Sequence, residues 1–234
     1  MTANRPGIRF GFPAPLLPDG VAPGTNILVS GATDSGARSV ALGLTAVESY
    51  RNESQLLLSA DVCGRELLDE ADAVTDTLDP SRTAVIDCSG TADEDHRFDQ
   101  LAAPIDGPGD LIAIETEFGT LYEKLRQSGY ARVRIGVFSI SSLLSHSDLQ
   151  TVSRFVHMLT GRVIATGDLG VFHIDSSLHP DVAVDVFEHF CDLRVEVRRT
   201  EEGEVQVRTG APGAELDEWD SVTPLTTSSP QRRS

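Results

Sequence analysis

Residues 30–39 read Ser30-Gly31-Ala32-Thr33-Asp34-Ser35-Gly36-Ala37-Arg38-Ser39. An apolar run leads into this stretch and a helix-compatible run follows it, so it is expected to join a strand to a helix. A phosphate-binding loop at such a junction has two spaced glycines followed by Lys and then Ser or Thr. Gly31 and Gly36 stand at the glycine positions, but Ala37 replaces the lysine and Arg38 the hydroxyl residue. The setting of a phosphate-binding loop is present without its charged and metal-binding groups.

The composition is acidic and almost free of lysine. The 234 residues suffice for one α/β domain with a full core. Nineteen basic residues face 36 acidic ones, for a net charge of −17, and Lys124 is the only lysine. This pattern is typical of a protein that works in concentrated salt, where self-repulsion is screened, although an acidic protein of ordinary salinity stays an alternative. Duplex DNA is disfavoured, because phosphate contacts need clustered Lys and Arg.

Cysteine usage and hydropathy indicate a soluble cytoplasmic protein. The three cysteines, Cys63, Cys88 and Cys191, are widely spaced and form no C-x-x-C pair, which favours buried thiols over disulfides or zinc. The six histidines show no recognised ligand spacing, so no metal site is predicted, although a metal bound by His173 and His179, which flank Asp175, stays a minor alternative. We expect neither an export signal nor membrane insertion, because no apolar run approaches about 18 residues.

Strand-like and helix-like segments alternate along most of the chain. This order predicts an α/β fold with a mostly parallel central sheet, flanked by helices and ending in an antiparallel hairpin. We expect an irregular arm at 1–23, one domain at 24–210 and a disordered polar tail at 211–234. The predicted strands are 26–30, 55–59, 83–88, 133–139 and 170–175, with the hairpin at 193–199 and 204–208.

The predicted helices have recognisable starts. Asp110 and Asp148 are expected N-caps, and Pro180 stands at a favoured first-turn position. The helices are predicted at 36–50, 64–73, 110–128, from 148 past residue 163, and 180–190. Residues 89–109 are predicted as a long loop whose acidic run, Asp93-Glu94-Asp95-His96, is interpreted as a solvated surface.

Several stretches together resemble the RecA-like ATPases of the KaiC/GvpD type, in particular the short single-domain versions of halophilic archaea. The resemblance covers about residues 24–199. It rests on the entry to the loop, the strand at 133–139 with the residues after it, and the closing helix and strand. The matching stretches are 24–29, 132–144, 160–162, 170–175, 179–181 and 190–198.

The resemblance implies an active site whose key groups are replaced here. The family's loop lysine corresponds to Ala37, and the hydroxyl that binds Mg²⁺ corresponds to Arg38, with Ser39 one position too late. The carboxylate that ends the second nucleotide strand corresponds to Phe138. The glutamate that orients the attacking water corresponds most nearly to Asp61. Phosphoryl transfer depends on the lysine and the metal, so the resemblance implies a degenerate member with little or no hydrolysis.

The favoured interpretation is a non-hydrolysing regulatory or interaction module. The loop backbone retains the form of an anion-binding nest, so weak binding of ATP or ADP is compatible with it, and Mg²⁺ lacks its anchors. The residues expected to contact a nucleotide are Gly31, Ala32, Thr33, Asp34, Ser35, Gly36, Ala37, Arg38 and Ser39, and no catalytic residue is expected apart from the weak candidate Asp61.

Two other interpretations stay open. A slow ATPase would use Arg38 in place of the lysine and Asp61 or Asp87 for the metal. The simpler interpretation of Asp87 is a strand-end carboxylate bound by loop amides. If the loop match is accidental, the chain has an unrelated α/β function.

Relatives of this type act in assemblies, which implies a protein partner or a homo-oligomer. The hairpin at 193–208 offers a predicted exposed edge for strand addition.

Overall fold

The computed structural model describes residues 9–12, 16–17, 19–47, 52–75, 78–90 and 102–222. Within these ranges nine strands form one sheet in the order β4-β3-β2-β5-β6-β1-β7-β8-β9. The first seven strands of this order are parallel, whereas β8 and β9 are antiparallel additions at one end. The strands are β1 (Thr25–Gly31), β2 (Glu53–Ser59), β3 (Thr83–Asp87), β4 (Ala102–Pro104), β5 (Arg132–Phe138), β6 (Leu169–Asp175), β7 (Leu193–Arg199), β8 (Val205–Gly210) and β9 (Asp220–Val222).

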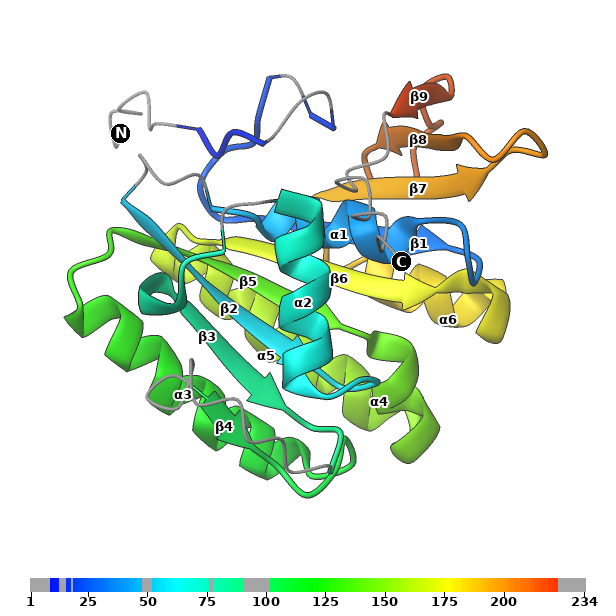
Figure 1. Ribbon diagram of the computed structural model, residues 1–234. Coiled ribbons are helices and arrows are strands. Elements are labelled where there is room, and N and C mark those ends of the chain that lie inside the picture. The colour runs from blue at the N-terminus through cyan, green and yellow to red at the C-terminus, as the bar shows by residue number, and fades with distance from the viewer. Residues whose placement is uncertain are drawn as a thin grey trace, which may run out of the picture.

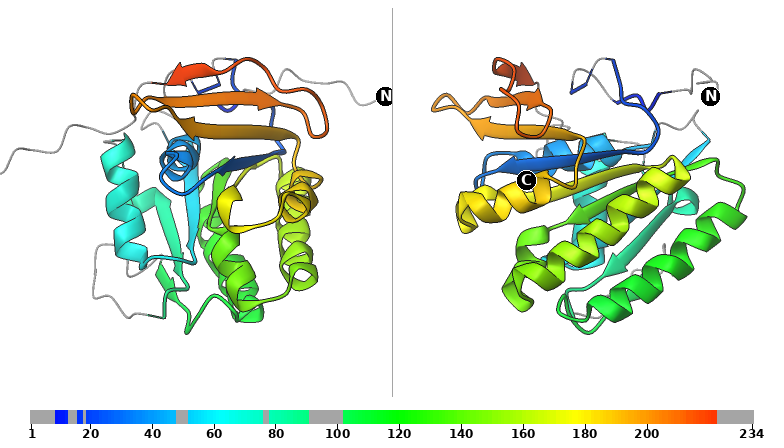
Figure 2. Two further views of the ribbon diagram at one scale, coloured as in Figure 1. Left: turned by 90° about the vertical axis from the view of Figure 1, so that its right-hand side faces the viewer. Right: turned by 180° about the vertical axis from the view of Figure 1, so that it is seen from behind.

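Helices cover both faces of the sheet. Helices α1 and α2 lie on one face, and α3, α5 and α6 lie on the other (Figure 1, Figure 2). The helices are α1 (Ala37–Thr45), α2 (Gly64–Thr75), α3 (Leu111–Gln127), α4 (Ile140–His146), α5 (Leu149–Thr166) and α6 (Asp181–Glu188), with 3₁₀ turns η1 (Pro80–Arg82) and η3 (Ser176–Leu178). In β1, Ile27 and Val29 pack toward α1 while Leu28 packs toward α5, as expected for a parallel strand buried on both faces.

The predicted architecture is confirmed at the level of an α/β fold with a mostly parallel sheet, flanking helices and a C-terminal antiparallel hairpin. Both predicted carboxylate caps are present. Asp110 accepts a hydrogen bond from the Ala113 amide at 3.0 Å, and Asp148 accepts one from the Thr151 amide at 2.9 Å. Each carboxylate thus satisfies one of the amides that a helix leaves unpaired in its first turn.

Two short edge strands differ from the sequence prediction. β4 lies inside the predicted loop at 89–109, and β9 lies inside the tail predicted as disordered from residue 211. Both have three residues, too few for a readable alternating pattern, and both form by pairing with an existing edge. Because β9 pairs with Val205–Val207 of β8, the outer edge of this end of the sheet belongs to β9 and not to the hairpin.

Other predictions fall partly outside the described ranges. The acidic run Asp93-Glu94-Asp95-His96 and residues 223–234 lie wholly outside them. In the N-terminal arm, Phe10 and Val21 form an antiparallel bridge, and the Phe10 side chain is buried. Among the described residues, no helix is long and apolar enough to cross a membrane.

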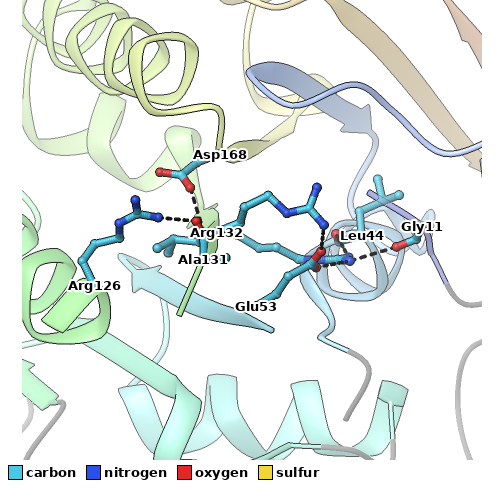
Figure 3. Close-up of polar contacts among 9 residues, drawn as sticks. Gly11, Leu44, Glu53, Arg126, Ala131, Arg132 and Asp168 are labelled. Carbon is cyan, nitrogen blue, oxygen red and sulfur yellow. Dashed lines mark hydrogen bonds and ion pairs between the residues drawn. The ribbon is translucent and has the colours of Figure 1, made fainter. Parts of the chain in front are cut away.

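An ion cluster lies at the amino ends of β2 and β5 (Figure 3). Glu53 binds Arg132 and also accepts from Arg134 Nε at 2.8 Å. Arg134 further donates to the carbonyl oxygens of Leu44 at 3.3 Å and Gly11 at 2.9 Å. The cluster therefore joins two strands, the end of α1 and the N-terminal arm.

Candidate functional site

The stretch at residues 31–36 forms the turn from β1 into α1. Gly36 has φ 93°, and Asp34 also has a positive φ, at 64°. The Ser35 hydroxyl accepts a hydrogen bond from the Ala37 amide at 3.2 Å. A Cβ on Gly31 would lie 2.4 Å from the Ser35 oxygen and 2.7 Å from the Val197 carbonyl oxygen. Gly31 is therefore required because Ser35 folds back into the loop.

Contacts from neighbouring elements hold this loop from outside. The Thr33 hydroxyl donates to Asp175 at 2.5 Å, and the Thr33 amide donates to the Ser177 hydroxyl at 3.4 Å. Arg199 of β7 donates to the Asp34 carbonyl oxygen at 2.8 Å. Burial raises the pKa of the Asp175 carboxyl, but the hydrogen bonds from Ser177 and Thr33 outweigh it, and the net shift is downward. Asp175 therefore stays charged and fastens the loop to the end of β6.

The side chain of Arg38 lies between α1, α2 and the carboxyl ends of β2 and β5. It donates to Asp61 at 2.7 Å and to Glu70 at 2.5 Å, and its guanidinium carbon lies 5.6 Å from the centroid of the Phe138 ring. Burial lowers the pKa of Arg38, yet the two carboxylates raise it by more, so the net shift is upward. We call Arg38, Asp61, Glu70 and Phe138 the Arg38 cluster.

His173 of β6 lies beside this cluster. Its ring stacks on Phe138 with the centroids 6.4 Å apart, and its Nδ1 is buried without a hydrogen-bond partner. Burial lowers the pKa of His173 to about 4, and the charge of Arg38 adds to the shift. The imidazole is therefore neutral at pH 7, and the floor of the site is made of two uncharged rings.

The contacts of Arg38 and Thr33 lie at the edge of the sheet where ligands bind in related topologies. In doubly wound sheets, ligands bind beyond the carboxyl ends of neighbouring strands whose connections leave toward opposite faces. One such pair is β2 and β5, where Arg38 binds Asp61 and the Ala60 amide donates to the Phe138 carbonyl oxygen at 2.5 Å. The other pair is β6 and β1, where Thr33 binds Asp175. The chain's own groups thus bridge both crevices.

The other predicted candidates do not assemble into a catalytic centre. Asp61 lies near the loop as expected, but its carboxylate is bound to Arg38. Asp87 accepts from the amides of Gly64 at 2.7 Å and Ser89 at 2.9 Å, in agreement with the interpretation of a strand-end carboxylate bound by loop amides. Ser39 is half-buried in the first turn of α1. The carboxylates near the loop therefore have structural partners.

The same groups do not fit a magnesium ion. Mg²⁺ prefers carboxylates and waters in octahedral geometry, whereas Phe138 is fully buried at the end of β5 and Asp61 and Glu70 face a guanidinium. Within the described ranges no group of three or more His, Cys, Asp or Glu side chains is arranged to hold a metal. The three cysteines are free thiols; burial, with a smaller effect of Asp87, raises the pKa of Cys88 to about 12.

Sequence reasoning assigned no role beside the loop to four residues that shape the site: Glu70, His173, Asp175 and Arg199. Each lies far along the chain from the loop it contacts, directly or through Arg38. Asp175 gave a usable signal, because it ends a predicted strand on the same sheet edge as the loop. The positions of His173 and Arg199 follow from the sheet order and that of Glu70 from the packing of α2 against α1, and periodicity reveals neither.

Residues 24–197 match DUF7504, described as a family of unknown function, and the chain belongs to that family. The match covers the sheet from β1 into β7 and leaves β8, β9 and Trp219 beyond it. No curated protein matches the chain.

Proposed function

We propose that this DUF7504 chain is a non-hydrolysing regulatory or interaction module on a RecA-like scaffold of the KaiC/GvpD type. It binds ATP or ADP weakly or not at all. The observation that carries the proposal is the Arg38 cluster, in which the guanidinium that replaces the metal-binding hydroxyl is neutralised by two carboxylates of the same chain.

The chemistry of phosphoryl transfer supports this proposal. Catalysis there depends on a lysine and a metal ion that stabilise charge on the phosphates. Ala37 has no charge, and Arg38 is directed to Asp61 and Glu70. Phe138 places an apolar ring where a metal-binding carboxylate would be expected. Each of the three replacements removes transition-state stabilisation.

The state of the loop amides supports weak binding. An anion in the loop would need backbone N–H groups as donors. The Ser35 amide donates to Ala32 at 3.0 Å, the Ala37 amide to the Ser35 hydroxyl, and the Thr33 amide to Ser177. A phosphate must displace these contacts, and it also meets the negative charge of the exposed Asp34. A bound nucleotide therefore gains little from the loop.

The deciding measurement is a calorimetric titration of ATP and ADP in multimolar KCl, with and without Mg²⁺, together with an assay of phosphate release. We expect weak or absent binding that is indifferent to Mg²⁺, and no Mg²⁺-dependent phosphate release above the blank. The variant Ala37→Lys/Arg38→Thr, which restores two of the missing groups, is the comparison and should gain Mg²⁺-dependent affinity.

A slow ATPase is the alternative, favoured only by the presence of Asp61 beside Arg38. It requires Arg38 to leave Asp61 and Glu70 when nucleotide arrives. Tight Mg²⁺-dependent binding with turnover by the unaltered chain would establish this alternative and overturn the proposal.

A regulatory module needs a partner, which we infer to be a protein or a second copy of the chain in the cytoplasm. Light scattering in the same KCl solution tests the second copy directly: a monomeric mass excludes it and leaves another protein as the partner.

A further inference from the structure

A cleft of about 640 Å³ lies beside the loop, on the face of the sheet opposite to the Arg38 cluster. Its floor is the end of β1 with Arg194, Glu196 and Arg198 of β7, and its walls are α6 and Trp219. This volume is within the range of small-molecule sites, about 300–1,000 Å³.

Within the described part of the chain, Arg198 differs from Arg194 and Arg208 in having no carboxylate partner. Arg194 binds Glu188 at 3.0 Å and also Glu196, and Arg208 binds Glu196 at 2.5 Å. Arg198 donates only to the neutral side-chain oxygen of Gln206, at 2.9 and 2.7 Å, among the described residues. Gln206 and the Trp219 ring, 4.1 Å from the guanidinium carbon, hold Arg198 in place without neutralising its charge.

The opposite wall carries the reverse charge. Asp181 and Asp185, one helical turn apart on α6, both line the cleft and are exposed. No cation of the described residues lies within ion-pair distance of either. A ligand that enters the cleft therefore meets positive charge on the β7 side and negative charge on the α6 side.

Trp219 supplies a flat apolar surface between these charges. The guanidinium carbons of Arg198 and Arg208 lie 4.1 and 4.6 Å from its ring centroid, which fixes the half-buried indole on the hairpin. The segment before it is tied down as well, because the Gly213 amide donates to Glu188 at 2.9 Å and Thr209 to Asp217 at 2.8 Å. Trp219 is thus a preformed part of the cleft wall.

We propose that this cleft binds a small aromatic zwitterion of the α-amino acid type. The carboxylate of the ligand binds Arg198, its ammonium group lies toward Asp181 and Asp185, and its ring packs on Trp219. A simple anion would face the two aspartates and a simple cation would face Arg198, so a dipolar ligand fits both walls. Aromatic contacts of this kind add about 0.5–1.5 kcal/mol beyond area burial.

The inference is separate from the proposed function. It uses neither Arg38 nor the loop side chains, and two of its residues, Arg198 and Trp219, lie beyond the family match. If no nucleotide binds at the loop, the cleft can still bind an amino acid. If no amino acid binds in the cleft, the proposed function of the loop is unaffected.

The intrinsic fluorescence of Trp219 provides the test, because it is the only tryptophan. The full chain is titrated with L-phenylalanine, excited where phenylalanine does not absorb, and the fit is checked by calorimetry. We expect saturable binding with a dissociation constant of about 1 mM or below. Three analogues each lack one group: phenethylamine lacks the carboxylate, 3-phenylpropanoate the ammonium and L-alanine the ring. Each is expected to bind at least about tenfold more weakly, which corresponds to ~1.4 kcal/mol.

Variants of the cleft test which side chain binds the carboxylate of the ligand and which side chains bind its ammonium group. Arg198→Gln should weaken phenylalanine about tenfold more than it weakens phenethylamine, because both ligands share any effect of the lost contact between Arg198 and Trp219. Asp181→Asn/Asp185→Asn should leave the affinity for 3-phenylpropanoate unchanged. Arg154→Gln, which removes an exposed charge on α5 outside the cleft, is the charge-matched control and should bind like the unaltered chain. No saturable change with phenylalanine, equal binding of all three analogues, or equal loss in Arg154→Gln would overturn the proposal.

Discussion

Two arginine-centred ion clusters lie at opposite ends of the parallel strands, and they differ in burial. At the amino ends, Arg134 and Glu53 have side chains that are 0 % and 1 % exposed. At the carboxyl ends, the side chains of Arg38, Asp61 and Glu70 are 21 %, 28 % and 35 % exposed. The first cluster is an interior part of the fold. The second lies at the edge where such sheets bind ligands, and water still reaches it.

The buried cluster is constrained on every side. Arg134 uses Glu53 and the carbonyl oxygens of Leu44 and Gly11, and its guanidinium carbon lies 5.4 Å from the ring centroids of both Phe10 and Phe12. A buried ion pair is costly to break because one charge is left without water or partner. Water can reach the Arg38 cluster. Breaking one of its ion pairs should therefore lower the free energy of unfolding less than breaking the buried pair. The same kind of ion pair therefore stabilises the fold at the amino ends of the strands and fills the candidate site at their carboxyl ends.

The largest effect is expected for Glu53→Gln. This change leaves Arg134 buried without its counter-charge and should lower the free energy of unfolding by about 3–5 kcal/mol, measured by denaturant unfolding in multimolar KCl. The double variant Glu53→Leu/Arg134→Met removes the fully buried pair and leaves only Arg132, whose side chain is 18 % exposed, so this control should recover much of the loss. A loss below that of the single Arg38 variant described below would contradict the distinction between the clusters.

His173 should make the carboxyl-end site sensitive to acid. Its pKa is lowered from 6.5 to about 4, first by burial. Between these values the unfolded chain binds the proton and the folded chain does not, so the free energy of unfolding falls as the pH drops from about 6.5 to about 4 and then levels off. The full difference is about 3 kcal/mol.

Unfolding measured across this pH range checks the prediction. His173→Leu should remove that part of the pH dependence, while His146→Gln, at an exposed histidine, should keep it. The same acid sensitivity in both variants would assign the effect to other groups.

Local features of the fold could be predicted from the sequence, whereas the ion pairs of both clusters, which join distant residues, could not. The order of strands and helices, the loop position and the caps at Asp110 and Asp148 followed from local patterns, because caps and periodicity act within a few residues. Arg134 looked like an ordinary strand residue and Glu53 lay just before the predicted strand at 55–59, since their pairing depends on β2 lying next to β5. Arg38 was identified as an anomaly, but its partner Glu70 became visible only when α2 was placed against α1. The short strands β4 and β9 carry no pattern of their own.

A smaller effect is expected for Arg38→Met. The methionine keeps much of the aliphatic stem that packs near Phe138, and the partly exposed Asp61 and Glu70 can regain water. The free energy of unfolding should therefore fall by about 1 kcal/mol or less, as for partly exposed ion pairs. Denaturant unfolding of Arg38→Met and Glu53→Gln under the same conditions compares the two losses of unfolding free energy directly. A loss of several kcal/mol would mean that the Arg38 cluster is also a structural part of the core.

The smallest effect is a shift in the titration of His173 in the same Arg38→Met protein. Burial is the main reason for the low pKa of His173, and the positive charge of Arg38 lowers it further, whereas Asp61 and Asp175 raise it. Without the guanidinium, both carboxylates remain, so the pKa of His173 should rise while staying below its ordinary value. NMR titration of the imidazole measures the shift, and Arg154→Gln on α5 is the control. An unchanged pKa would mean that solvent screens Arg38 from His173, and the carboxyl-end cluster would then be more open to water than its distances indicate.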